Sequence, residues 1–344
     1  MKVLVVGAGS IGRRHLANLR ALGADRISLC DVDGPARQAA ASAFGVDAYA
    51  RLEEGLDTGP DAVLVCTPTH LHLPVLRAAL ETGAHVFVEK PLAASLEGTA
   101  ALAALARERG RVVLVGCNMR FHPGVAHLKE ALATGVPARP LTFRARFSHY
   151  LPNWRPGTDY RQSYSARRVH GGGIVAESVH EIDYLRWLGG EVVRVAGHVA
   201  RLSDLEIESE DWALLLLELQ SGALAEIHLD YLSPLKLRGC EIVGVDGVLR
   251  WTSEGKQPEA VRVERFDPAG ARRETLYASE AYDGNAMYVE ELRHFLDCCA
   301  GGAAPLLDLD GARRVLALTL AARDAPAGEW QPAPELAALP AVAT

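Results

Sequence analysis

The stretch Val3-Leu4-Val5-Val6-Gly7-Ala8-Gly9-Ser10-Ile11-Gly12 decides the fold of the first part of this chain. Its four apolar residues are typical of a strand that is buried on both faces of a parallel sheet. A G-x-G-x-x-G pattern follows at once and is expected to open a helix. The first glycine permits a tight turn, the second lets the backbone approach a pyrophosphate, and the third allows the helix to pack closely on the strand. The stretch therefore predicts a dinucleotide-binding unit, with a glycine turn that binds nothing as the alternative.

Four further apolar runs follow at intervals that leave room for helices. These predicted strands are 27–30, 62–66, 85–88 and 112–115, with helices between them, for example over 74–82 and 96–108. Continuous apolar strands that alternate with helices predict a doubly wound α/β domain, whose parallel sheet is covered on both faces. We assign this dinucleotide-binding Rossmann domain to residues 1–120.

The pattern changes after residue 120. Helices are predicted over 123–135, 171–190, 286–300 and 308–324, and strands over 141–147, 192–200, 211–219, 223–230, 237–245, 248–251 and 259–266. Strands that follow one another without intervening helices predict a mostly antiparallel sheet. The sequence therefore predicts an α+β domain over residues 121–330, followed by an Ala- and Pro-rich tail at 331–344.

Length, composition and charge exclude several classes of protein. The chain has 344 residues, 49% of them hydrophobic, and 36 Lys and Arg against 43 Asp and Glu, which suits two globular domains. A net charge of −7 argues against a general nucleic-acid-binding surface. No stretch approaches the roughly 20 apolar residues of a membrane span, and the run before Gly7 is too short for a signal peptide. The six cysteines show no metal-ligand spacing, so we expect reduced thiols and a cytoplasmic protein.

The position of Asp31 predicts the choice of cofactor. Asp31 ends the second predicted strand, where a carboxylate can accept both hydroxyls of the adenosine ribose and repels a 2′-phosphate. No arginine follows directly, since the next residues are Val32 and Asp33. The pattern therefore favours NAD over NADP. The candidate cofactor residues from this region are Gly7, Gly9, Ser10, Ile11, Gly12 and Asp31.

Lys90 is the first candidate for chemistry. It belongs to Glu89-Lys90-Pro91, directly after the strand at 85–88. Because ligands of a doubly wound sheet bind outside the carboxyl ends of its strands, Lys90 is expected beside the nicotinamide. A lysine there can donate or accept a proton once burial and a positive neighbour lower its pKa. A surface salt bridge with Glu89 is the alternative.

A second candidate constellation lies in the stretch 171–184, GGGIVAESVHEIDY. On one continuous helix, Glu177 and His180 are three residues apart and share a face, so that the carboxylate could orient the imidazole and raise its basicity. The three glycines would let the backbone approach a ligand closely. An ordinary surface pair is the alternative. No metal site is predicted, because His70 and His72 have no third ligand at a suitable spacing.

The connection over 144–168 combines arginines with aromatic residues. Its members are Arg144, Arg146, Arg155, Arg161, Arg167 and Arg168, with Phe147, Tyr150, Trp154, Tyr160 and Tyr164, against the single acid Asp159. Guanidinium groups and aromatic rings suit a small anionic or nucleotide-bearing substrate. A subunit interface and a groove for single-stranded nucleic acid are the alternatives.

Taken together, these motifs resemble the Gfo/Idh/MocA oxidoreductases. The resemblance rests on Gly7–Gly12, Thr67-Pro68 with His72, Glu89-Lys90-Pro91, and the triple glycine before His180, and it spans nearly the whole chain. It implies a Rossmann domain and an α+β domain with a large open sheet, through which homodimers or homotetramers form. It also implies reversible hydride transfer between NAD and a hydroxyl carbon of a sugar, cyclitol or sugar derivative.

The resemblance also assigns roles to individual residues. Lys90 matches the lysine of the family's Glu-Lys-Pro motif and His180 its catalytic histidine, while Thr67, Pro68, His72, Glu89 and Lys90 join the cofactor-binding set. Many members carry an aspartate four residues before that histidine. This chain has Ala176 there, and we expect Glu177 to orient His180 instead.

The stretch 151–167 resembles a bacterial subgroup linked to surface-polysaccharide and acidic-sugar pathways. Candidate substrate residues are Arg120, Trp154, Arg155, Tyr160, Arg161, Tyr164, Arg167 and His180. A non-catalytic NAD-binding regulator that senses a sugar on the same fold is the alternative function.

Overall fold

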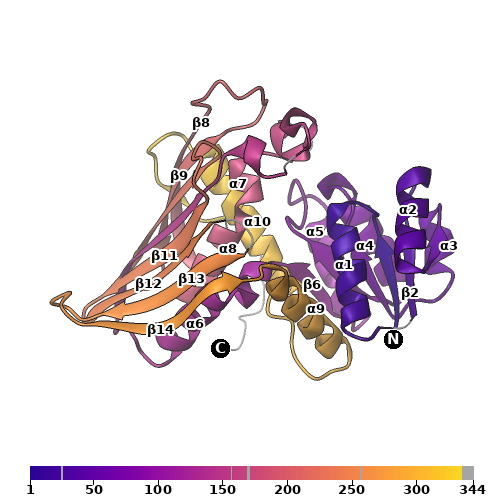
Figure 1. The fold of residues 1–344 in the computed structure, drawn as a ribbon, viewed down its shortest axis with the longest axis horizontal. Coiled ribbons are helices and arrows are strands. Elements are labelled where there is room, and N and C mark those ends of the chain that lie inside the picture. The colour runs from indigo at the N-terminus through magenta and orange to yellow at the C-terminus, as the bar shows by residue number, and fades with distance from the viewer. Residues whose placement is uncertain (25, 156, 169–170, 256–257, 335–344) are drawn as a thin grey trace. The chain divides into compact units, whose positions relative to one another are not determined.

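A computed structural model describes residues 1–24, 26–155, 157–168, 171–255 and 258–334. The chain forms two compact units, shown in Figure 1. The first unit comprises residues 1–117 and 288–316, and the second comprises residues 118–287 and the chain from 317 onward. Most of the predicted tail, residues 335–344, lies outside the described residues.

The first unit contains a six-stranded parallel sheet with the order β3-β2-β1-β4-β5-β6. This is the strand order of the doubly wound dinucleotide-binding fold, so the predicted fold class is confirmed. The elements are β1 (Lys2–Val6), α1 (Ser10–Ala21), β2 (Arg26–Cys30), α2 (Gly34–Phe44), β3 (Asp47–Tyr49), α3 (Leu52–Leu56), β4 (Ala62–Val65), α4 (His72–Glu81), β5 (His85–Glu89), α5 (Thr99–Glu108) and β6 (Val113–Gly116).

Two later helices carry the chain between the units, namely α9 (Asn285–Cys299) and α10 (Leu309–Asp324). Leu292 and Phe295 of α9 are fully buried in the same apolar core as Phe87 of β5, and the rings of Phe87 and Phe295 meet edge to face at 5.7 Å. This burial explains why residues 288–316 belong to the first unit. The sequence predicts one uninterrupted domain over 121–330, whereas in the structure residues 288–316 belong to the first unit.

The second unit contains a nine-stranded sheet with the order β14-β13-β12-β11-β7-β10-β9-β8-β15. All neighbours are antiparallel except β7 and β10, which confirms a mostly antiparallel sheet. The elements are α6 (Pro123–Ala133), β7 (Pro140–Ser148), α7 (Ile174–Glu177), α8 (Val179–Gly189), β8 (Val192–Ala200), β9 (Trp212–Leu219), β10 (Leu224–Asp230), β11 (Leu237–Gly244), β12 (Gly247–Glu254), β13 (Glu259–Phe266), β14 (Arg273–Tyr282) and β15 (Gln331–Pro332).

The two faces of this sheet differ in burial. Helix α6 packs on β12 and β13, and α8 packs on β7, so side chains of alternate residues such as Ile242 and Trp251 are buried beneath them. On the opposite face, the open face, side chains such as Arg144, Glu226 and Leu224 remain exposed. Among the described residues, no helix has the length and apolar character needed to cross a bilayer.

Candidate active site

The glycine turn between β1 and α1 has the geometry that a pyrophosphate requires. Gly7 has a φ of +111°, and a Cβ added to Gly12 would lie 1.9 Å from the carbonyl oxygen of Gly7, so neither position accepts a side chain. A Cβ at Gly9 would meet nothing within 4 Å. Gly9 is also the N-cap of α1, and Ser10 and Ile11 form the first turn, whose N–H groups have no acceptor within the helix. The turn thus leaves an open cradle at Gly9 that fits a dinucleotide phosphate.

Asp31 lies beside this turn. The N–H of Ala8 donates to its Oδ2 at 2.5 Å, and the N–H of Asp33 donates to its Oδ1 at 2.8 Å. The carboxylate is therefore fixed at the carboxyl end of β2, where the ribose of a bound dinucleotide would lie. Sequence reasoning overlooked Arg37, whose guanidinium donates to the backbone carbonyl of Asp31 at 2.7 Å.

The segments that follow β4 and β5 are joined by His72. Its Nδ1 lies 2.9 Å from the carbonyl oxygen of Pro91, and its Nε2 lies 2.9 Å from that of Thr67. Burial lowers the pKa of His72, so the ring is neutral and donates to one of the two carbonyls. The hydroxyl of Thr67 is buried without a hydrogen-bond partner among the described residues, which fits a donor reserved for a ligand. Pro68 is exposed.

Glu89 and Lys90 lie at the same edge of the sheet. Glu89 is buried, its Oε1 lies 2.7 Å from Nε2 of His15, and its Oε2 accepts the N–H of Lys90 at 3.2 Å. The half-buried Lys90 directly follows β5. Because β1, β4 and β5 are neighbours, the Gly9 turn, Thr67 and Lys90 all stand at adjacent carboxyl ends. Sequence reasoning missed His15, a fully buried helix residue that carried no signal of its contact with Glu89.

In the second unit, the helix predicted over 171–190 is broken. Helix α7 ends at Glu177 and α8 begins at Val179, with Ser178 at φ −98° and ψ 28° between them. The argument that Glu177 and His180 share the face of one continuous helix is therefore wrong. The cause is that α7 is anchored elsewhere, since Oε1 of Glu177 accepts the hydroxyl of Ser165 at 2.5 Å. Both Glu177 and His180 are nonetheless buried, with exposed fractions of 8% and 7%.

Two residues of the triple glycine, Gly172 and Gly173, serve packing inside the second unit. A Cβ at Gly172 would lie 2.1 Å from the carbonyl oxygen of Tyr164. Gly173 has a φ of +121°, and its Cβ would lie 2.2 Å from Oε1 of Glu210. At Gly172 and Gly173 the expectation that the glycines open the backbone to a ligand is therefore not met, because the space is filled by protein.

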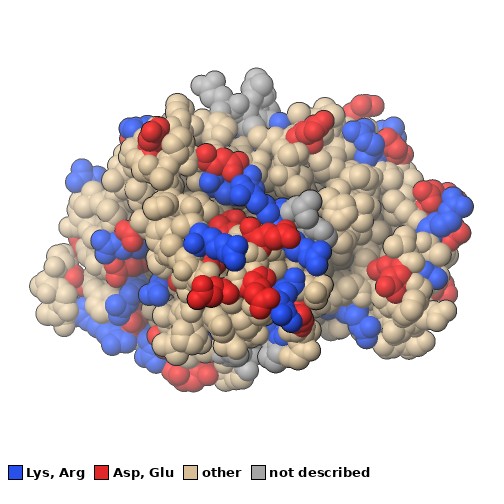
Figure 2. Space-filling view, turned by 90° about the horizontal axis from the view of Figure 1, so that it is seen from above, with Lys and Arg blue, Asp and Glu red and all other residues tan. Residues whose placement is uncertain are grey.

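The arginines of the 144–168 connection lie in different surroundings in the structure. Arg144 lies in β7 on the open face, within 3.5 Å of Glu241. Arg161 makes a bidentate pair with Asp159 at 2.8 and 3.0 Å, which neutralises it locally. Figure 2 shows the same mixture, with basic and acidic side chains next to one another over the visible face. The predicted single basic patch is thus not continuous.

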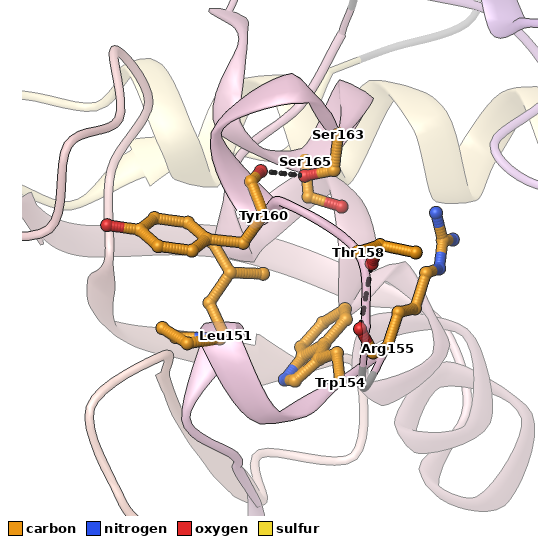
Figure 3. A pocket seen from close by; sticks show the side chains of 8 residues that line it. Leu151, Trp154, Arg155, Thr158, Tyr160, Ser163 and Ser165 are labelled. Atoms are coloured by element: carbon orange, nitrogen blue, oxygen red, sulfur yellow. Dashed lines mark hydrogen bonds between the residues drawn. The ribbon is translucent and has the colours of Figure 1, made fainter.

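A small pocket lies within this connection. Its lining residues are Leu151, Pro152, Trp154, Arg155, Thr158, Tyr160, Ser163 and Ser165. Figure 3 shows the rings of Trp154 and Tyr160 on its walls and the hydroxyls of Thr158 and Ser163 turned to backbone carbonyls. Arg155 is exposed, and within the described part of the chain no acid pairs with it. Tyr164 and Arg167 are half-buried beside the pocket segment, and Arg167 donates to the side-chain oxygen of Gln162 at 3.3 Å.

Arg120 is buried and does not line this pocket. Its Nε and Nη2 donate to Asp183 at 2.9 and 2.7 Å, and its guanidinium lies over the ring of Trp187. Two of its nitrogens are therefore committed to α8 rather than to a substrate. Within the described residues, no group of three or more His, Cys, Asp or Glu side chains is arranged around a common metal position.

The cradle at Gly9, the fixed carboxylate of Asp31 and the lysine at the sheet edge define a dinucleotide-dependent oxidoreductase as the class of protein. Comparison with known families identifies the family within this class. A model described as the oxidoreductase family with an NAD-binding Rossmann fold matches residues 1–117, and the GFO/IDH/MocA C-terminal domain matches residues 125–250. The chain belongs to the Gfo/Idh/MocA family, as predicted.

Individual relatives agree with this assignment. The scyllo-inositol 2-dehydrogenase (NAD(+)) of Bacillus subtilis is 29% identical over 325 residues, which cover 90% of both chains. The 1,5-anhydro-D-fructose reductase of Ensifer adhaerens is 30% identical over 71% of this chain and 74% of its own. Use of NAD and membership of the dehydrogenases that act on CH–OH groups are thereby confirmed.

Solved structures show the same fold. Levoglucosan dehydrogenase in complex with NADH and levoglucosan aligns with a TM-score of 0.85 at 20% identity, over 97% of this chain and 100% of the other. The WlbA dehydrogenase from Bordetella pertussis, in complex with NADH and UDP-GlcNAcA, aligns with a TM-score of 0.77 at 25% identity, over 97% and 99%.

Proposed function

We propose that this dehydrogenase interconverts a hydroxyl and a carbonyl on a sugar, cyclitol or sugar derivative, with His180 and Lys90 handling the proton. The observation that carries the proposal is the position of Lys90 at the carboxyl end of β5, on the same sheet edge as the Gly9 cradle. Bound NAD supplies the hydride acceptor. In the oxidation His180 takes the hydroxyl proton as general base while Lys90 polarises the same oxygen, and in the reverse reduction Lys90 can protonate that oxygen. We propose that Glu177 orients His180, since both side chains are buried and lie only three residues apart in the chain.

The substrate class we propose is an anionic or nucleotide-linked sugar. Support comes from Arg155, the pocket arginine that lacks an acidic partner among the described residues, and from the rings of Trp154 and Tyr160. An unpaired guanidinium can bind a carboxylate or phosphate through two hydrogen bonds, and aromatic rings offer a surface for a sugar or base. A structural relative carries UDP-GlcNAcA, an acidic nucleotide sugar.

The test is turnover with NAD across sugar acids, cyclitols and nucleotide sugars, followed by absorbance of the reduced cofactor. On the best substrate, His180→Ala and Lys90→Met should each lower kcat about 100-fold or more while NAD still binds. His127→Ala serves as the matched control, because His127 lies on α6 and pairs with Glu130 at 3.0 Å. Near-normal turnover by either variant would remove that residue from the mechanism. Tight NAD binding without turnover on any compound would favour the sugar-sensing regulator.

We also propose that homodimers or homotetramers form through the open face of the second sheet. Charges alternate across this face, with Arg144 next to Glu226 and Glu241, and Arg250 next to Glu264, while Leu224 is 48% exposed. Such a surface is complementary to a second copy of itself. Light scattering after gel filtration, with Leu224→Glu as the variant, measures the assembly. A cytoplasmic location is proposed on the six free cysteines, which suit a reducing compartment.

A further inference from the structure

Ser165 connects the pocket to the carboxylate of Glu177. The residue is 2% exposed, it lines the pocket, and its hydroxyl donates to Oε1 of Glu177 at 2.5 Å. A serine hydroxyl has a single proton, so this contact uses the whole donor capacity of the side chain. A hydrogen bond from a neutral hydroxyl to an ionised carboxylate is short and strong, and it favours the charged form of the acid.

The backbone of Ser165 is also held by hydrogen bonds. Its carbonyl oxygen accepts the hydroxyl of Ser209 at 2.8 Å and the N–H of Gly173 at 3.1 Å. Gly173 is the N-cap of α7, the single turn that carries Glu177 at its end. One residue therefore holds both ends of α7, the start through its carbonyl and the last side chain through its hydroxyl.

Tyr231 is a titratable group close to Glu177. The hydroxyl of Tyr231 is fully buried, and burial followed by the charges of Glu177, Tyr164 and Glu210 raises its pKa well above the ordinary value. Tyr231 therefore stays neutral and next to an acid that is already held by Ser165. Burial likewise raises the pKa of Glu210, whose Oε1 accepts the N–H of Val175 at 3.3 Å.

We propose that Ser165 is a positioning residue for the reaction, which fixes the Glu177 carboxylate in its ionised form and in one orientation, and so couples the pocket segment to the acid that serves His180. The inference rests on the proposed function for its catalytic meaning. The geometry of the Ser165–Glu177 contact stands independently of it.

Ser163 provides a matched control on the same wall of the pocket. Its hydroxyl donates to the backbone carbonyl of Tyr160 at 2.6 Å (Figure 3). Loss of either hydroxyl removes one hydrogen bond from the same short segment. Ser163→Ala therefore tests whether loss of any hydroxyl from this segment changes the titration of Glu177.

The first experiment titrates the Glu177 carboxyl directly. The full-length protein is labelled with ¹³C at the side-chain carboxyl of glutamate, and the Glu177 resonance is assigned by its absence in Glu177→Gln. In Ser165→Ala the midpoint should rise by about one pH unit, a tenfold change in the ionisation constant. It should stay at the wild-type value in Ser163→Ala and return toward it in Ser165→Thr, which restores a hydroxyl.

The second experiment follows the pH dependence of kcat and KM on the best substrate of the panel. Ser165→Ala should lower kcat about tenfold with little change in KM, and the acidic limb of the kcat profile should move to higher pH. An unchanged titration in Ser165→Ala, or an equal shift in Ser163→Ala, overturns the inference. If wild-type protein turns over no compound, the proposed dehydrogenation fails, while the titration still decides whether Ser165 controls the charge of Glu177.

Discussion

Gly9 and Gly12 of the nucleotide turn should respond in opposite ways to the same added methyl group. At Gly12 the new Cβ would lie 1.9 Å from the Gly7 carbonyl oxygen, whereas ordinary contacts begin at 3.4 Å, so the turn or the helix must shift by 3.4 − 1.9 = 1.5 Å. At Gly9 the methyl meets no protein atom within 4 Å, and the φ of −67° suits alanine. The structure therefore predicts that Gly12 is required for folding and Gly9 for binding of the cofactor.

The expected magnitudes follow from these geometries. A displacement of this size in a packed turn should make Gly12→Ala less stable by about 3 kcal/mol, at the upper end of the usual cost of overpacking. Gly9→Ala should be as stable as the wild type, or more stable by about 0.5 kcal/mol, since alanine restricts the unfolded chain. Its methyl occupies the cradle, so NAD affinity should fall about tenfold or more, which is about 1.4 kcal/mol.

Urea unfolding followed by circular dichroism measures the stability of both variants, and titration calorimetry of the folded Gly9→Ala protein measures its affinity for NAD. Wild-type stability in Gly12→Ala would show that the turn relaxes without cost. Wild-type NAD affinity in Gly9→Ala would show that the pyrophosphate does not approach at Gly9, and the assignment of the cradle would be lost.

Two further predictions concern the stability of the second unit. Burial alone would raise the pKa of Asp230, but hydrogen bonds from His228 and three further donors lower it to about 2. Because this folded value lies below the ordinary 3.8, the stabilisation is complete above pH 4 and is lost as the pH falls toward 2. Asp230→Asn should therefore remove about 1–2 kcal/mol of pH-dependent stability in that window. Urea unfolding at a series of pH values should then show a free energy of unfolding that falls less steeply below pH 4 than in the wild type. An unchanged pH dependence would contradict the lowered pKa of Asp230. In Gly124→Ala the new Cβ would lie 2.1 Å from Nε1 of Trp251, so the melting temperature should drop by several degrees, and an unchanged melting temperature would mean that the indole moves freely.

The doubly wound unit is predictable because its strands are short continuous apolar runs, which only a sheet covered on both faces can bury. Strand β14 escaped prediction for the opposite reason. Its residues over 273–282 are exposed or half-exposed throughout, so no alternation marks it. The return of residues 288–316 to the first unit depends on the contact of Phe295 with Phe87, two residues more than two hundred positions apart.

The candidate site was predictable at the level of single residues but not of their partners. The separation of Arg144 from the pocket was available in the sequence, because Phe143, Ala145 and Phe147 alternate with it in a strand and must face the other way. The break at Ser178 had no such signal. Ser165, twelve residues before Glu177, and Glu210, which precedes β9, contact α7, and helical spacing cannot show contacts of that kind.

Helix α8 illustrates how the fold positions His180. Glu181 and Asp183 follow it on the same helix and are fully buried, and each accepts a bidentate arginine, Arg238 at 2.8 and 3.1 Å and Arg120 at 2.9 and 2.7 Å. Removing one member of such a pair leaves a buried charge without compensation, at a cost of about 3–5 kcal/mol. The two arginines come from β11 and from the segment before α6, so they hold the helix from two directions. Under the proposed function, His180 is the proton acceptor on this helix, and a helix fixed in this way can hold it in a single orientation to which the substrate must fit.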